Sequence, residues 1–157
     1  MVFSRKYLFW LFLSFLTVVI DLFVKQRALV WFSQPASFIE GRFVTFGLHK
    51  NPGIIFDIPV PPLFLWSLTI VLISFLLVLA WREQKTNPRV STGALITVIG
   101  ALGNFIDRVL HGFTTDYLLF FTRSAVNLSD LVIIAGILTL LLTKKATHSG
   151  SLPTEKG

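Results

Sequence analysis

The chain has 157 residues, of which 54% are hydrophobic and 14% are charged, and its formal net charge is +6. Charged residues make up about a quarter of an ordinary soluble domain, so this composition excludes that class and indicates one integral membrane domain. The chain has no cysteine, which excludes disulfides, thiol nucleophiles and cysteine-based metal sites.

Four apolar runs are long enough to cross a hydrocarbon core about 30 Å thick, which takes roughly 20 helical residues. They cover residues 7–24, 63–81, 92–109 and 126–143. We therefore predict an all-α membrane fold with four transmembrane helices and both termini on the same side. Residues 1–145 form a single domain in this prediction, and residues 146–157 form a disordered cytoplasmic tail.

Basic residues mark the predicted cytoplasmic side and lie at the ends of the apolar runs, which argues against a nucleic-acid partner. They are Arg5, Lys6, Arg82, Lys85, Arg89, Lys144 and Lys145. The positive-inside rule then places both termini in the cytoplasm and residues 25–62 and 110–125 outside it. Four basic residues depart from the rule and fall in the first external segment: Lys25, Arg27, Arg42 and Lys50.

The first apolar run also resembles a cleavable signal peptide, because Arg5 and Lys6 precede it. Asp21 and Lys25 close the run without a convincing small-residue cleavage site, so an uncleaved span is favoured. The two residues are four apart with the acid first, so they can pair along a helix. Near the membrane surface, Lys25 can extend toward a lipid phosphate.

Residues 42–49 have strand character, because β-branched and aromatic residues dominate them. Asn51, Pro52 and Gly53 follow with turn chemistry, and residues 54–56 are again apolar. We therefore predict a short hairpin or small sheet, forming an extracytoplasmic β-element.

The third run ends in a polar helix face. Gly100, Gly103, Asn104, Asp107 and Arg108 follow the i, i+3, i+4, i+7, i+8 spacing that places side chains on one side of a helix. Glycines on such a face permit close helix contact, so the face is predicted to point into the bundle.

Asp116 and Asp130 lie at the edges of apolar runs, where a carboxylate is costly and usually marks a functional site. Asn127 lies three residues before Asp130, the same spacing that separates Asn104 from Asp107. Two carboxylates held close together cannot both ionise easily, so one of them keeps a proton. Such a pair can act as both acid and base on a water molecule and a carbonyl group.

The chain resembles the lipoprotein signal peptidase family, also called signal peptidase II, through a series of motifs in order along nearly its whole length. The motifs are Asp21 to Lys25, Asn51 to Phe56, Gly100 to Arg108 continuing to Gly112, Asp116 and Tyr117, and finally Asn127 to Asp130. This resemblance implies a bacterial membrane aspartic endopeptidase that cuts a lipid-modified prolipoprotein before its diacylglyceryl cysteine.

The resemblance also implies roles for individual residues. The family's catalytic aspartates fall on Asp116 and Asp130. Supporting or substrate-binding positions fall on Asn51, Gly53, Asn104, Arg108, Asn127, Asp21 and Lys25. No metal or organic cofactor is implied, and the expected partners are the lipid-modified substrate and membrane phospholipid. We expect a monomer in the bacterial inner membrane, with its active site toward the extracytoplasmic side.

Several positions depart from the family pattern: Ile55, Ile99, Tyr117, Val126 and Ser129. Tyr117 and Ser129 add hydroxyl groups next to the two aspartates in sequence, where they are expected to tune the pair. The departures at Ile55, Val126 and Ser129 leave open the alternative that the chain is a catalytically silent relative that binds lipidated peptides. Paired membrane carboxylates also relay protons, so a small proton-coupled transporter subunit is a further alternative.

Overall fold

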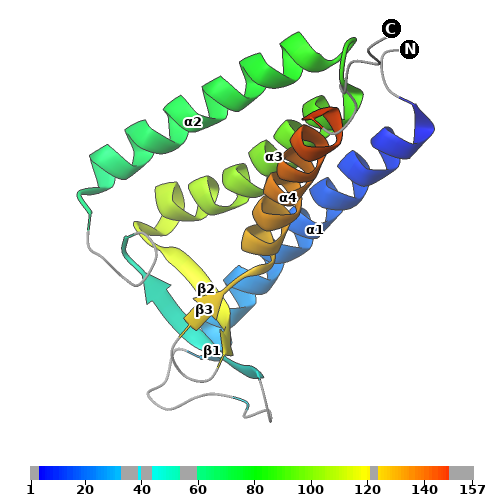
Figure 1. Cartoon of the computed structure of the whole chain (residues 1–157). Coiled ribbons are helices and arrows are strands. Elements are labelled where there is room, and N and C mark those ends of the chain that lie inside the picture. The colour runs from blue at the N-terminus through cyan, green and yellow to red at the C-terminus, as the bar shows by residue number, and fades with distance from the viewer. Residues whose placement is uncertain (1–3, 33–38, 40–43, 54–59, 121–123, 149–157) are drawn as a thin grey trace, which may run out of the picture.

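A computed structural model describes residues 4–32, 39, 44–53, 60–120 and 124–148, with side chains described as far as Thr143. Its four long helices are α1 (Arg5–Trp31), α2 (Pro62–Glu83), α3 (Pro88–His111) and α4 (Leu128–His148). The start of α1, the turn between α2 and α3 and the end of α4 lie at one end of the bundle (Figure 1). A small sheet lies at the opposite end (Figure 1). Helix α3 packs against each of the other three helices.

Three helices, α1, α2 and α3, are long and apolar enough to cross a membrane, with mean hydropathies of 2.2, 2.7 and 1.5. The apolar part of α4, Leu128–Thr143, is shorter. In α2, Leu65 and Ala80 are the only buried residues, so most of its apolar surface faces outward. An apolar exterior of this kind requires lipid around it, and the protein is a multi-pass membrane protein.

The helices extend beyond the boundaries that hydrophobicity predicted. Helix α1 continues to Trp31 instead of ending at residue 24, because Asp21 and Lys25 face the interior and pair with each other instead of ending the apolar run in water. Helix α4 continues to His148, so the first residues of the predicted tail are helical. The rest of that tail, 149–157, lies outside the described residues.

The sheet contains β1 (Val44–Asn51), β2 (Thr114–Phe120) and β3 (Ser124–Val126), paired antiparallel in the order β1-β2-β3. The predicted strand over 42–49 corresponds to β1. Its partner is β2, from a segment for which no strand was predicted, and residues 54–56 lie outside the described residues. Val126, predicted to begin the fourth span, ends β3 instead.

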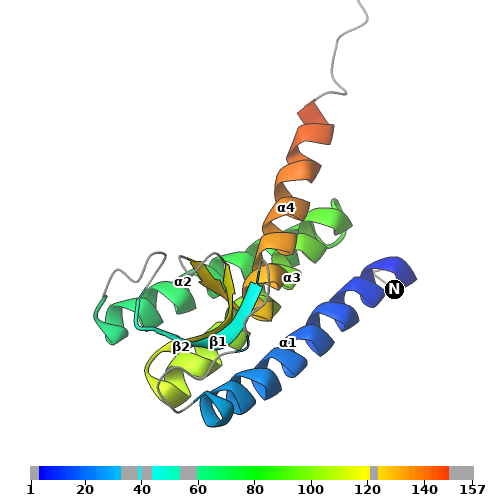
Figure 2. The same cartoon turned by 90° about the horizontal axis from the view of Figure 1, so that it is seen from below.

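The register of β1 and β2 brings the first strand to the polar end of the bundle. His49 lies opposite Asp116, and Asn51 lies opposite Thr114, after an irregularity between Phe46 and His49. Seen from below, the strands lie in front of α3 and α4, with α1 along one side (Figure 2). The sheet therefore covers the bundle end at which α3 ends and α4 begins.

Close contact between α3 and α4 depends on two glycines of the predicted polar face. A Cβ atom at Gly100 would lie 2.8 Å from the carbonyl oxygen of Ser129, and one at Gly103 would overlap the Ser129 hydroxyl. Small residues at a helix interface let two backbones approach. Here they bring the first turn of α4 against the polar end of α3.

The interior at this end is polar. Its buried polar and charged side chains are Asp21, Lys25, Asn104, Asp107, Thr114, Thr115, Asp116, Asn127 and Ser129. Burial of so many polar groups is costly unless they satisfy one another by hydrogen bonds or ion pairs. Their mutual contacts therefore define the candidate site.

Candidate active site

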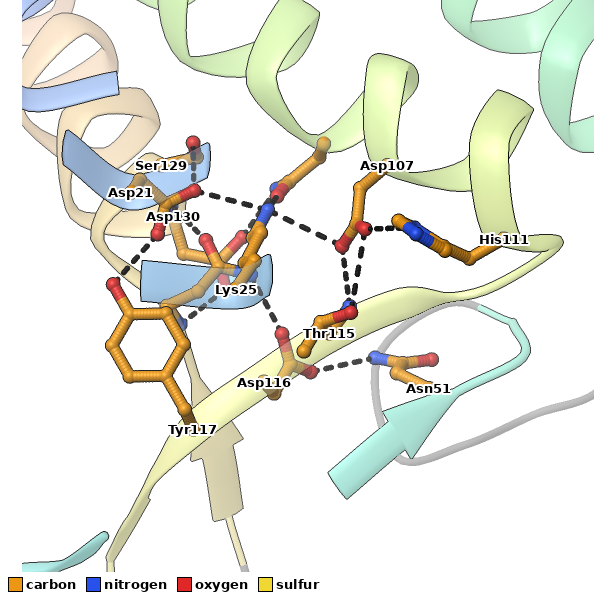
Figure 3. A network of polar contacts seen from close by, with 12 residues as sticks. Asp21, Lys25, Asn51, Asp107, His111, Thr115, Asp116, Tyr117, Ser129 and Asp130 are labelled. Carbon is orange, nitrogen blue, oxygen red and sulfur yellow. Dashed lines mark hydrogen bonds and ion pairs between the residues drawn. The ribbon is translucent and has the colours of Figure 1, made fainter. Parts of the chain in front are cut away.

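Asp116 and Asp130 come from different elements and are bridged by one residue. Asp116 lies in the middle of β2 and is 2% exposed, whereas Asp130 lies in the first turn of α4 and is partly exposed. Asn127, directly before α4, donates from Nδ2 to Asp116 Oδ1 at 2.6 Å and from its backbone N–H to Asp130 Oδ2 at 3.1 Å. The start of α4 thus holds both carboxylates (Figure 3).

The same asparagine caps the helix. Asn127 Oδ1 accepts a hydrogen bond from the backbone N–H of Asp130 at 3.0 Å, and the Asp130 carboxylate accepts from the backbone N–H of Asn127. This reciprocal pattern is a capping box, which satisfies two backbone donors at the start of a helix. The spacing of Asn127 and Asp130 therefore has a structural cause as well as a chemical one.

Amides also hold the remaining oxygens of the pair. Asn104 of α3 donates from Nδ2 to Asp130 Oδ1 at 2.7 Å. Asn51, the last residue of β1, donates from Nδ2 to Asp116 Oδ2 at 3.3 Å. Each of the four carboxylate oxygens therefore accepts a hydrogen bond from an uncharged amide, and these bonds come from three asparagines.

The electrostatic environment favours a proton on the pair. Among the described residues, no lysine or arginine lies within ion-pair distance of Asp116 or Asp130. Burial and the negative charge of Asp130 raise the pKa of Asp116 from its ordinary value of 3.8 to about 6, although the amide hydrogen bonds from Asn127 and Asn51 limit the rise. A carboxyl group with a raised pKa can donate a proton near neutral pH.

Lys25 lies behind this pair and not at the membrane surface. It is fully buried, with Nζ 3.0 Å from Asp21 Oδ2, 3.5 Å from Asp107 Oδ2 and 2.8 Å from Asn104 Oδ1. The expectation that Lys25 extends to a lipid phosphate is therefore wrong. The longer α1 carries Lys25 into the polar interior, where Asp21 and Asp107 balance its charge, and Lys25 orients Asn104 toward Asp130.

Tyr117 and Ser129 bond to Asp21 and not to the pair. The Tyr117 hydroxyl donates to Asp21 Oδ1 at 2.7 Å, and the Ser129 hydroxyl donates to Asp21 Oδ2 at 2.6 Å (Figure 3). The sequence expectation placed both hydroxyls beside the two aspartates. It was wrong because neighbouring side chains on a strand point to opposite faces, and neighbours on a helix diverge by about 100°.

Arg108 anchors the segment that follows β1. Its guanidinium group donates to the carbonyl oxygen of Gly53 at 3.1 Å, and the backbone N–H of Gly53 donates to Asn51 Oδ1 at 3.0 Å. Arg108 therefore holds the turn that orients Asn51 toward Asp116. The contact agrees with a supporting position for Arg108.

The sequence did not predict the contacts that join Asp107, Thr115 and His111. Asp107 accepts hydrogen bonds from the backbone N–H of Thr115 at 2.6 Å and from the Thr115 hydroxyl at 3.3 Å. It also lies 2.8 Å from Nδ1 of His111, one helical turn later. The i, i+4 spacing of Asp107 and His111 was a visible signal, but the contact with Thr115 depends on β2, which was not predicted.

Comparisons with known proteins agree with these features. A sequence profile described as signal peptidase (SPase) II matches residues 13–145. A lipoprotein signal peptidase of Coxiella burnetii is 28% identical, covering 93% of this chain and 95% of its own. A lipoprotein signal peptidase of Halothermothrix orenii is 32% identical, and the alignment covers 68% of this chain and 66% of the relative. A lipoprotein signal peptidase of Brucella ovis is 28% identical, and the alignment covers 88% of this chain and 91% of the relative.

Two solved structures share the fold. Both are described as bacterial membrane enzymes, and both are 20% identical to this chain in sequence. The first superposes with a TM-score of 0.78 and covers 99% of this chain and 96% of the solved chain. The second superposes with a TM-score of 0.71 and covers 90% of this chain and 94% of the solved chain. This likeness extends to the four helices and the small sheet.

Proposed function

Because the chain belongs to the signal peptidase II family of aspartic peptidases, we propose that Asp116 and Asp130 are its catalytic pair and that its substrates are lipid-modified prolipoproteins. The observation that carries the proposal is the bridge through Asn127, which holds one oxygen of each carboxylate. An aspartic peptidase needs two carboxylates near each other with one proton between them. Amide donors orient the carboxylates, and Lys25, the buried cation of this region, contacts Asn104 and forms no ion pair with either aspartate of the pair.

With one proton on the pair, one aspartate acts as a base and the other acts as an acid. The ionised carboxylate takes a proton from a water molecule as its oxygen attacks the carbonyl carbon of the scissile peptide bond, and the neutral carboxyl donates its proton to the carbonyl oxygen. As the C–N bond of the resulting diol breaks, the carboxyl that took the proton from water donates it to the leaving amine. One diol hydroxyl returns its proton to the other carboxylate, so the pair again holds one proton. The raised pKa of Asp116 supports a shared proton, which belongs to the pair as a whole.

The position of the pair suits a substrate anchored in the bilayer. Asp116 and Asp130 lie at the sheet end of the bundle, where the apolar parts of α3 and α4 meet polar residues. We propose that the substrate's diacylglyceryl chains stay in the lipid while its peptide crosses the pair, and that cleavage occurs before the lipidated cysteine. The sheet end then faces the extracytoplasmic side of the inner membrane.

The proposal is tested with purified protein and a synthetic lipopeptide. Asp116→Asn and Asp130→Asn are each expected to lower the cleavage rate of a diacylglyceryl-modified lipobox peptide by at least about a hundredfold while binding is retained, because each removes an acid–base group. Glu83→Gln is the matched control, since it makes the same change at the other end of the bundle and should cleave normally. Products are identified by mass spectrometry.

The same variants distinguish the alternatives. Wild-type protein that binds the lipopeptide without cutting it would support a catalytically silent relative. Proton flux into reconstituted vesicles that both asparagine variants abolish, without cleavage by wild type, would support a transporter subunit. Either outcome overturns the peptidase proposal.

A further inference from the structure

The carboxylate of Asp21 lies on α1, outside the catalytic pair, and four donors from three elements converge on it. Asp21 Oδ1 accepts from the Tyr117 hydroxyl at 2.7 Å and from the backbone N–H of Leu128 at 2.9 Å. Asp21 Oδ2 accepts from the Ser129 hydroxyl at 2.6 Å and lies 3.0 Å from Lys25 Nζ. Hydrogen bonds to an ionised acceptor are shorter and stronger than those between neutral groups.

Two of these donors are direct sequence neighbours of the two aspartates of the proposed catalytic pair. Tyr117 follows Asp116 in β2, and Ser129 precedes Asp130 in α4. Consecutive Cα atoms are 3.8 Å apart, so a displacement of either hydroxyl-bearing residue moves the neighbouring aspartate almost equally. One carboxylate therefore fixes both chain segments that bear the pair.

We infer that Asp21, Tyr117 and Ser129 form a clamp that sets the separation of Asp116 and Asp130, with Tyr117 and Ser129 acting as positioning residues. The inference rests on the proposed catalytic role of the two aspartates. Tyr117 and Ser129 donate to Asp21 and not to the pair, and the Tyr117 hydroxyl also accepts from the backbone N–H of Leu128 at 3.2 Å.

Burial makes the clamp rigid. Asp21, Lys25 and Ser129 are fully buried, and Tyr117 is 3% exposed. Polar networks that are fully satisfied in a low-dielectric interior restrict motion, because any displacement leaves a buried donor or acceptor unpaired. Burial and the negative charge of Asp21 also raise the pKa of Tyr117, so its hydroxyl remains a donor at any working pH.

The clamp acts alongside the Asn127 bridge without duplicating it. Asn127 contacts both aspartates directly but depends on the position of the first turn of α4. The hydrogen bonds from Leu128 and Ser129 to Asp21 fix that turn against α1, and Tyr117 fixes β2 to the same point. Asn127 thus spans a distance that the clamp determines.

Tyr117→Phe, Ser129→Ala and the double variant test the clamp, with kcat and KM measured separately on the lipopeptide. Each single variant should lower kcat about tenfold with little change in KM, because misplacement of reacting groups by a fraction of an ångström costs rate and not substrate binding. The double variant should be little slower than Tyr117→Phe, because loss of the Tyr117 hydroxyl already frees β2 from Asp21, whereas the backbone N–H of Leu128 still bonds to Asp21 in every variant.

Ser91→Ala is the structural control. Ser91 is a buried serine whose hydroxyl donates to the carbonyl oxygen of Ala80 at 2.8 Å, at the opposite end of α3 from the site. Its loss should lower the melting temperature without lowering kcat. Should the double variant fail to fold, each single variant still tests the clamp by comparison with Ser91→Ala at equal loss of melting temperature.

The outcomes separate this inference from the proposed function. Unchanged kcat in both single variants, or rate losses that multiply independently in the double variant, would overturn the clamp. If Asp116→Asn and Asp130→Asn also cleave normally, the proposed catalytic pair itself fails. If those two variants are inactive while Tyr117→Phe and Ser129→Ala keep full kcat, only the clamp fails.

Discussion

Asp116 is a carboxyl group that the fold buries beside a second carboxylate, and its pKa is raised to about 6 as a result. The folded protein therefore keeps a proton on this group to a higher pH than the unfolded chain, in which the ordinary value is 3.8. Between these values the folded state binds more protons, so the free energy of unfolding decreases as pH rises through this window. The burial that raises the pKa of Asp116 thus has a stability cost at neutral pH.

Asp116→Asn is expected to recover part of that cost. An amide carries no charge, so the variant should be more stable than wild type by about 1–2 kcal/mol at pH 8. This is the cost of ionising a carboxyl group whose pKa is about 6 in place of 3.8, less about 1 kcal/mol for one hydrogen bond that the new amide nitrogen cannot accept. At pH 4 the difference should vanish or reverse. Melting temperatures at the two pH values in the same detergent check this, and an equal difference at both would contradict it.

The sequence identified most residues of the candidate site, but their partners were harder to infer. Asn104 and Asn127 bond to the aspartates as their motifs suggested. Asn51, for which the sequence suggested no contact with an aspartate, also bonds to Asp116. Tyr117 and Lys25 were assigned the wrong surroundings, because proximity in sequence says little about which way a side chain points from a strand or about how far a helix continues. Hydrogen bonds between elements distant in sequence, such as that from Tyr117 to Asp21, need the fold.

Among the elements, α3 and α4 form the contact on which the site depends. Their polar ends meet because Gly100 and Gly103 leave room for the first turn of α4. The helices were predictable from apolar runs, whereas β2 and β3 were not. Strand β3 has three residues and is too short to show a periodicity, and the seven residues of β2 change from polar to apolar without strict alternation. Strand β1 was recognisable by composition, but its pairing with β2 joins segments far apart in the chain.

Gly103→Ala is expected to separate α3 from α4 at the site. The added methyl group would meet the side chains of Ser129 and Val18, so α4 must shift, at a cost of about 1–3 kcal/mol for overpacking. We expect a lower melting temperature and a lower kcat together. Gly93→Ala is the control, because its Cβ would lie 3.1 Å from Gly136 O, away from the site. That variant should lose stability and retain kcat, and normal kcat in Gly103→Ala would contradict the role of this contact.

At the scale of the whole molecule, the sheet lies at one end of the bundle and the α2–α3 turn at the other (Figure 1). Lys85 and Arg89 lie near that turn, and the positive-inside rule therefore places it in the cytoplasm. We therefore expect the candidate site at the sheet end to be extracytoplasmic. Residues at the two ends should differ in their accessibility from outside the cell.

Single-cysteine labelling tests this orientation directly, because the chain contains no cysteine of its own. Ser124→Cys, exposed in β3, should react in intact spheroplasts with a thiol reagent that does not cross membranes. Thr86→Cys, exposed in the α2–α3 turn, should react only after permeabilisation. The opposite pattern would reverse the predicted topology.

The placement of the buried charges also bears on how the chain enters the bilayer. Asp21 and Lys25 are four residues apart on α1, and Asp107 and His111 are four apart on α3. Membrane helices insert before they associate, and an unpaired charge at membrane depth is costly during that interval. Each helix carries a partner for its own acid, so α1 and α3 can insert individually. Both local pairs are kept when Lys25 of α1 also pairs with Asp107 of α3.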